Sequence, residues 1–264
     1  NCLICAKIVI LLPATSTNHS LGIPFIEIFS VESTNNYAMQ LVQEGFAGHG
    51  TACYAYEQTA GKGQRGKAWH AQAGENITIS VVFNTNSLQV FTQFAFSMTI
   101  ALGVCDFLRI YTAGDTFIKW PNDLYWRDRK AGGILIENII RGKEWQWAVA
   151  GIGINVNQTL FDTTLTNPVS LKQITGKEHN PVLLAKELCK SLEYRYNQLL
   201  TSGASSILED YNGVLYKRGN QIKLKKDNAV FECKLKGVDI SGKLLVVRNL
   251  EESFNAGEVE WVFN

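Results

Sequence analysis

The sequence predicts an α+β protein whose larger part mixes strands and helices and which ends in a small all-β module. Three observations support this prediction. Segments with the alternation of strands recur between residues 23 and 156. Two segments, 91–111 and 180–200, carry apolar residues at helical spacing. After residue 217 the chain changes to short, turn-separated strands at 221–225, 230–238, 243–247 and 258–263. We therefore divide the chain into an N-terminal extension at 1–22, a first domain at 23–216 and a second at 217–264.

Composition excludes several classes of function. Of the 264 residues, 46% are hydrophobic and 19% are charged, as in a folded protein with a sizeable core. The net charge of +1 gives the chain no general affinity for DNA or an anionic membrane, so a basic site must be local. Six scattered cysteines favour a cytoplasmic location, and the pair Cys2 and Cys5 lacks the two further ligands that zinc needs. No apolar run reaches the roughly 18 residues of a membrane span, and the apolar start lacks the flanks of a signal peptide.

The strands of the first domain are predicted from alternation and from the residues that end them. Pro24 precedes the first strand, and Pro121 ends a short strand because it cannot donate to a ladder. The expected strands are 23–31, 51–58, 76–83, 116–120, 134–140 and 145–156.

The helices are predicted from capping signals and apolar spacing. Asn180 and Pro181 form an N-cap followed by proline at the first helical position. Ser33 to Asn36 supply capping side chains ahead of a short helix that Gly45 stops. That helix start could be a cap only, or it could also hold polar groups of a ligand. The expected helices are 37–43, 91–111, 180–200 and 206–215.

A glycine-rich basic loop follows the second strand, from Gln58 to Trp69. Its glycines allow close approach of backbone amides and positive φ, and its cations suit a phosphate or carboxylate. These residues are Gly61, Gly63 and Gly66 with Lys62, Arg65 and Lys67. The spacing also fits a dinucleotide-binding turn, but that motif needs a following helix and an acidic residue about 20 positions on. A strand and then Thr85-Asn86-Ser87 stand there instead, so a Rossmann oxidoreductase is excluded.

A second group of motifs predicts another wall of a ligand site. The segment Lys119-Trp120-Pro121-Asn122-Asp123 places an amide and a carboxylate at a rigid strand end, although a simple Asn-Asp turn would look the same. Lys130 precedes the paired glycines Gly132 and Gly133, which weaken a strand unless something approaches its backbone. A further Gly-x-Gly at 151–153 leads to Asn155, and alone it could simply relieve crowding.

Together, four segments resemble the biotin protein ligases (biotin–[acetyl-CoA-carboxylase] ligases) in order and spacing. They are 58–69, 119–125, 130–137 and 151–155, and the likeness covers roughly residues 25–264. The resemblance implies a mixed β-sheet backed by helices, of the class II synthetase-like biotin/lipoate ligase fold, followed by an SH3-like β barrel. It implies that biotin and MgATP give biotinyl-5′-adenylate, whose biotin then passes to a lysine of a biotin carboxyl carrier protein domain. Only about 30 residues precede Ser33, so we expect a ligase-only monomer or homodimer without a DNA-binding winged helix.

The resemblance also implies roles for individual residues. Around the biotin ureido head it places Ser33, Thr34, Asn35 and Gln58. Around the carboxylate and the adenylate phosphate it places Gly61, Lys62, Gly63, Gln64, Arg65, Lys67 and Lys130. Trp69 would close over the adenylate, and Gly133 would allow backbone contact with biotin. On the nucleotide and magnesium side it places Asn122, Asp123 and Asn155. Asp123 would in addition orient the acceptor lysine or take its proton, and the expected catalytic residues are Lys130, Asp123, Lys62 and Arg65.

One departure from the family pattern concerns the loop. Gln64 stands where many relatives have arginine, and a neutral amide holds an acyl phosphate less firmly than a bidentate guanidinium. We therefore expect faster loss of the adenylate. Two other functions remain open at this point: a lipoate or octanoate protein ligase of the same superfamily, and a non-catalytic biotin-binding regulator.

Overall fold

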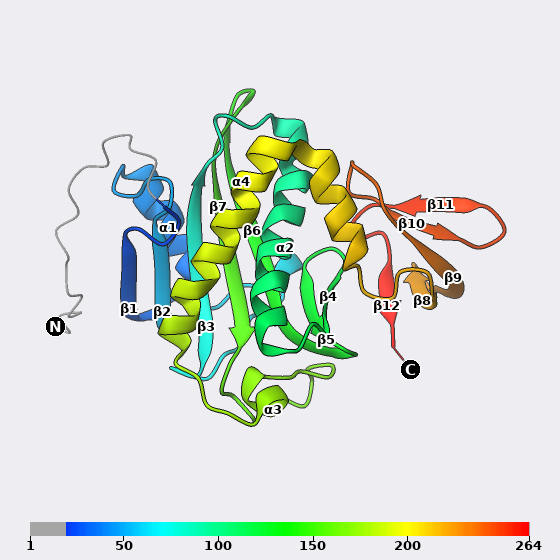
Figure 1. The fold of residues 1–264 in the computed structure, drawn as a ribbon, viewed down its shortest axis with the longest axis horizontal. Helices are drawn as coiled ribbons and strands as arrows, with labels where there is room; N and C mark the ends of the chain where they lie inside the picture. Colours follow the sequence, from blue (N-terminus) through cyan, green and yellow to red (C-terminus); the bar gives the residue numbers. More distant parts are fainter. Residues whose placement is uncertain (1–19, 264) are drawn as a thin grey trace.

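The computed structural model describes residues 20–263, so the predicted extension lies outside them except for its last three residues. A large β-sheet stands at the centre, helices cover both of its faces, and a smaller sheet lies at one end (Figure 1). The predicted α+β fold class is confirmed.

The large sheet has seven strands in the order β1-β2-β3-β7-β6-β5-β4. Its β1 and β2 are parallel and the other neighbours are antiparallel, so the sheet is mixed as expected. The strands are β1 Phe25–Val31, β2 Ala52–Gln58, β3 Asn76–Asn84, β4 Thr116–Lys119, β5 Asp123–Trp126, β6 Arg129–Arg141 and β7 Glu144–Asn155.

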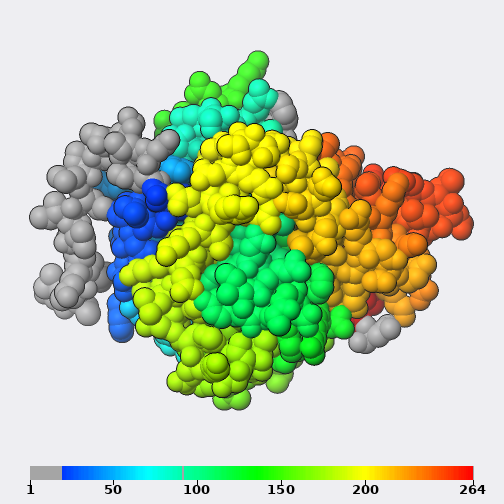
Figure 2. All heavy atoms as spheres, viewed as in Figure 1, coloured from blue at the N-terminus to red at the C-terminus, as the bar shows by residue number. Residues whose placement is uncertain are grey.

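The two faces of this sheet carry different helices. Helix α1 (Thr34–Gln43) packs with Ala38 and Leu41 on Val82 and Val149 of one face. Helices α2 (Gln93–Tyr111) and α4 (Pro181–Gly213) bury the opposite face and form the outer surface there (Figure 2). Helix α2 is long and apolar enough to cross a membrane, but 67% of its apolar window is buried, as in a core helix. The short helix α3 (Leu171–Thr175) and two 3-10 turns, Gln64–Gly66 and Val90–Thr92, complete this part.

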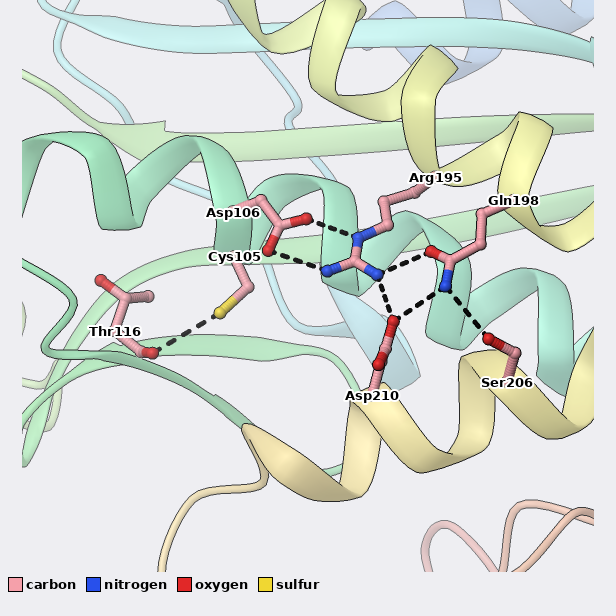
Figure 3. Close-up of polar contacts among 7 residues, drawn as sticks. All are labelled: Cys105, Asp106, Thr116, Arg195, Gln198, Ser206 and Asp210. Atoms are coloured by element: carbon pink, nitrogen blue, oxygen red, sulfur yellow. Dashed lines mark hydrogen bonds and ion pairs between the residues drawn. The ribbon is translucent and has the colours of Figure 1, made fainter. Parts of the chain in front are cut away.

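Helix α4 contains the two predicted helices, 180–200 and 206–215, which meet at a kink. Gly203 has φ 78° and ψ 177° at the bend. An arginine joins the two halves: Arg195 pairs with Asp210 beyond the bend at 2.5 Å and with Asp106 of α2 at 2.5 Å (Figure 3). Gln198 donates to Ser206 across the same bend. This network fixes the angle at which α4 crosses α2.

The C-terminal residues form a separate five-stranded antiparallel sheet in the order β11-β10-β9-β8-β12, as expected of an SH3-like module. Its strands are β8 Gln221–Lys226, β9 Ala229–Val238, β10 Leu244–Val247, β11 Glu251–Phe254 and β12 Glu260–Val262. The module is attached by buried polar contacts. Trp120 Nε1 donates to Gly242 O at 3.0 Å, and Asn212 makes two hydrogen bonds with the backbone of Val238.

Several boundaries differ from the prediction. Strand β6 begins at Arg129 rather than at 134, so its paired glycines lie inside the strand. Strands β5 and β11 and helix α3 were not predicted. In the case of β6, hydrogen bonds from the partners β5 and β7 outweigh the weak strand preference of glycine, and a local sequence pattern does not contain those partners.

Candidate active site

The start of α1 is capped by a residue from another strand. Ser33 is the N-cap residue, but its side chain makes no capping hydrogen bond. Instead Gln58 Oε1, at the end of β2, accepts from Thr34 N at 2.8 Å and from Thr34 Oγ1 at 3.0 Å. The interpretation of Ser33 as a plain side-chain cap was therefore wrong. The four residues predicted for the ureido head are brought together, and three are buried: Ser33, Thr34 and Asn35.

Asn35 is the centre of a hydrogen-bond cluster beneath this helix start. Its Nδ2 donates to Glu137 Oε2 at 2.8 Å and to Leu135 O at 3.2 Å. Its Oδ1 accepts from the buried Ser80 Oγ at 2.6 Å. A Cβ atom added at Gly151 would lie 2.3 Å from Asn35 Oδ1, so glycine is required there for Asn35 to reach its partners.

The glycine loop is held by two backbone hydrogen bonds. Gly63 N donates to Lys67 O at 2.6 Å, and Trp69 N donates to Gly61 O at 2.8 Å. Of its glycines only Gly66 has positive φ, at 73°. The expectation of positive φ at Gly61 and Gly63 was wrong. Gly61 is needed for close approach, because a Cβ atom there would lie 2.4 Å from Trp69 O.

The cations of this loop have different partners. Lys62 Nζ donates to Asn36 Oδ1 of α1 at 2.6 Å. The Arg65 guanidinium instead lies against the C-terminal module: a Cβ atom at Gly257 would be 2.0 Å from Arg65 Nη2. The two side chains thus extend to opposite neighbours of the loop, α1 and the C-terminal module.

The second predicted wall contains a lysine pair around one carboxylate. Lys130 Nζ lies 2.7 Å from Asp123 Oδ1, and Lys119 Nζ lies 3.6 Å from Asp123 Oδ2. Burial lowers the pKa of Lys119, Asp123 opposes this shift, and the charges of Lys130 and Lys67 add to it. Lys67 of the glycine loop is therefore electrostatically coupled to this group.

Two residues that were predicted to contact the nucleotide donate hydrogen bonds to backbone carbonyl groups in this structure. Asn122 Nδ2 donates to Ile134 O. Asn155 is buried and its Nδ2 donates to Val169 O at 3.1 Å and to Lys130 O at 3.4 Å. Asn155 therefore positions the strand that carries Lys130.

The two walls meet on the α1 face of the sheet, over its glycines. Trp69 lies over Gly153, where a Cβ atom would be 2.3 Å from the indole Cε2. Gly153 pairs with Gly133 across β6 and β7. A Cβ atom at Gly133 would in turn be 3.6 Å from Asp123 Oδ1 and 3.7 Å from Lys130 Nζ. Because residues two apart in a strand share a face, Asn35 over Gly151 and Trp69 over Gly153 border one surface.

This surface has a floor of glycines and an unpartnered donor. The Trp69 Nε1 atom is buried and has no hydrogen-bond partner. A cavity of about 840 Å³ lies elsewhere, where the end of α4 meets the C-terminal sheet, and none of the predicted site residues lines it. Its charge, its glycine floor and its buried polar groups therefore make the α1 face the candidate active site.

Sequence reasoning gave no role to four residues that this arrangement uses. Ser80 could have been noticed as a hydroxyl in a buried strand, and Lys119 was named only as the cation that begins the second wall segment. Glu137 and Gly257 carry no local signal, because their partners Asn35 and Arg65 are far away in the sequence.

Comparison with known proteins finds relatives of this chain. Residues 28–155 match the model of the biotin/lipoate A/B protein ligase family. The bifunctional ligase/repressor BirA of Bacillus spizizenii is 30% identical over 220 residues, covering 82% of this chain and 67% of that protein. The biotin–[acetyl-CoA-carboxylase] ligase of Paracoccus denitrificans is 29% identical over 219 residues, covering 81% and 90%.

Solved structures with a similar fold include other biotin protein ligases. A biotin protein ligase from Aquifex aeolicus in complex with biotin and ATP superimposes with a TM-score of 0.76 at 24% identity, covering 90% of this chain and 98% of that one. A biotin protein ligase from Leishmania major in complex with biotinyl-5-AMP gives a TM-score of 0.62 at 21% identity, covering 90% and 98%. By sequence and by fold, the chain belongs to the biotin protein ligases of the biotin/lipoate A/B protein ligase family.

Proposed function

We propose that this protein joins biotin to ATP as biotinyl-5′-adenylate and then transfers biotin to a lysine of a biotin carboxyl carrier protein domain. One observation carries the proposal. A buried polar cluster at the start of α1, a glycine floor and the Lys130–Asp123 pair border one surface of the sheet. A ligand with a polar head, a fused ring system and an anionic tail matches these three parts in that order.

The polar head would be recognised at the start of α1. A urea offers two N–H donors and one carbonyl acceptor, and it needs partners of both kinds when it is buried. Hydroxyl and amide side chains supply both, and they are Ser33, Thr34, Asn35 and Gln58. A ring reaching Gly153 would displace the Trp69 indole, which could then cover it and find a partner for its Nε1.

Adenylate formation requires two anions to meet. Biotin's carboxylate is ionised at neutral pH and needs no general base, but it must approach an anionic α-phosphate. Lys62 and Lys130 would reduce this repulsion and stabilise the charge that builds on phosphorus, and Lys67 and Arg65 would add to the local positive charge.

The metal in this reaction belongs to the substrate. Among residues 20–263 no group of three or more His, Cys, Asp and Glu side chains could hold a metal ion. The one carboxylate in the second wall, Asp123, already faces two lysines. We therefore propose that Mg²⁺ arrives bound to the phosphates of ATP.

In the transfer step the acceptor lysine must lose a proton before its amine can attack the acyl phosphate. Asp123 is the carboxylate nearest to Lys130 at the glycine floor, and we propose that it orients the incoming ammonium group. Asp123→Asn should slow transfer to the carrier more than adenylate formation, which single-turnover assays of each step would measure. Transfer at the full rate would remove this role.

The reducing cytoplasm is the proposed location, since the four cysteines within the described residues are buried and unpaired.

The test of the function is ATP–pyrophosphate exchange with biotin, lipoate and octanoate, compared side by side and followed by transfer to a purified biotin carboxyl carrier domain. Exchange and transfer with biotin alone are the expected results. Faster exchange with lipoate or octanoate would instead indicate a lipoate-type ligase. Biotin binding without any exchange would indicate a non-catalytic regulator.

A further inference from the structure

Lys119 is enclosed by aromatic rings from two parts of the chain. Its side chain is 12% exposed, and its Nζ lies 5.4 Å from the ring centroid of Tyr125 and 5.5 Å from those of Trp261 and Phe263. Tyr125 and Phe263 stack at 6.1 Å, and Trp261 and Phe263 stack at 6.5 Å. Tyr125 belongs to β5, whereas Trp261 and Phe263 belong to the end of the C-terminal module.

We infer that Lys119 is a positioning residue for adenylate formation and that the end of the C-terminal module holds it in place. The inference rests on the proposed function. Asp123 has two oxygens, and each faces one lysine: Oδ1 faces Lys130 at 2.7 Å and Oδ2 faces Lys119 at 3.6 Å.

The consequence for Lys130 follows from charge balance. To reach an acyl phosphate, Lys130 must leave Asp123 or share it. A partly buried carboxylate that loses its only cation is destabilised, so without Lys119 the ion pair would retain Lys130. With Lys119 in place, Asp123 keeps a counter-ion while Lys130 turns to the substrate.

Lys119 itself is not available for the substrate. Its exposure is about a third of that of Lys130, whose side chain is 35% exposed. Ring faces attract an ammonium group and fix its position. Burial lowers the pKa of Lys119, while Asp123 acts in the opposite direction and helps to keep the ammonium form. The rings and the carboxylate therefore act on the same charge.

The same C-terminal segment also touches the first wall. Arg65 of the glycine loop lies against Gly257, where a side chain would leave no room for the guanidinium. The φ of 99° at Gly257 also favours glycine. Residues 257–263 thus contact one residue of each wall, Arg65 and Lys119, and this double contact explains why the module matters to a site that is built on the large sheet.

The experiment measures kcat and the KM for biotin in ATP–pyrophosphate exchange for Lys119→Met. We expect kcat to fall by about 10- to 100-fold, less than the roughly 100- to 1000-fold loss from removing a transition-state donor, because Lys130 is held back rather than removed. The KM for biotin should stay within about threefold, because the polar cluster at α1 is untouched. Lys119→Arg should recover part of kcat. Lys217→Met is the matched control, since Lys217 also combines an ion pair (3.0 Å to Asp128) with a ring (5.1 Å to Tyr216) outside the site.

A double-mutant cycle tests whether Lys119 acts through Asp123. Lys119→Met should cause no further loss of exchange in an Asp123→Asn background, where no carboxylate is left to retain Lys130. Trp261→Leu should lower kcat less than Lys119→Met does and should add nothing to it. Melting curves should show all variants folded. Wild-type kcat in Lys119→Met, or losses that multiply in the double mutants, would overturn the inference while leaving the ligase function intact. Absence of exchange in the wild type would overturn both.

Discussion

Replacing Gly151 by alanine should disrupt the polar cluster beneath α1. The new Cβ atom would lie 2.3 Å from Asn35 Oδ1 and 2.8 Å from its Cγ, so the carboxamide must move. Asn35 then loses hydrogen bonds to Ser80, Leu135 and Glu137, the last of which is charge-assisted. At about 1 kcal/mol for each neutral bond and about 2 kcal/mol for the charged one, the total is roughly 4 kcal/mol. Relaxation and water recover part of it, and we expect a loss of about 2 to 4 kcal/mol.

Thermal unfolding and biotin titration calorimetry measure the two consequences. For a chain of this size the expected fall in Tm is roughly 4 to 7 °C. Biotin affinity should drop at least about tenfold, equivalent to about 1.4 kcal/mol, because the ureido partners are no longer held. Gly213→Ala is the control, since a Cβ atom there has nothing within 4 Å. If Gly151→Ala melts and binds biotin as Gly213→Ala does, the cluster does not hold Asn35 in the way described.

Three further predictions concern stability, thiol chemistry and the loop. Arg195→Leu leaves Asp106 and Asp210 unpaired and should lower the free energy of unfolding in urea by about 1 to 3 kcal/mol. This is less than for a fully buried pair, because both carboxylates are about a third exposed or more. A loss equal to that from breaking the exposed Lys236–Glu251 pair would contradict this prediction. Burial raises the pKa of the Cys53, Cys105 and Cys189 thiols from 9.0 to about 12. Iodoacetamide at pH 8.5 should therefore label them only in the unfolded chain. The free energy of unfolding should fall as pH rises above 9, because the thiols of the unfolded chain lose protons that the native ones keep. Gln64→Arg should slow adenylate dissociation in a chase experiment, and an unchanged rate would refute the role given to this position.

The candidate site could be predicted from the sequence because its residue types are unusual for ordinary loops and strands. Three glycines and three cations in Gly61–Lys67, and paired glycines after Lys130, are costly to a fold and indicate a ligand. Helical and alternating periods likewise predicted the long helices and most strands, since these patterns are local. The sequence did not show why particular positions must be glycine. Gly61 and Gly151 are required because other residues pack closely against their backbone in the folded chain.

The sequence by itself determined the fold class, the two walls of the site and the family. Only the tertiary structure decided which residues complete those walls. Gln58 caps α1, Glu137 holds Asn35, and Trp261 encloses Lys119, each from a strand far away in the sequence. Local patterns report the period of a helix or strand, whereas these contacts depend on how the sheet orders its strands and on where the C-terminal module docks.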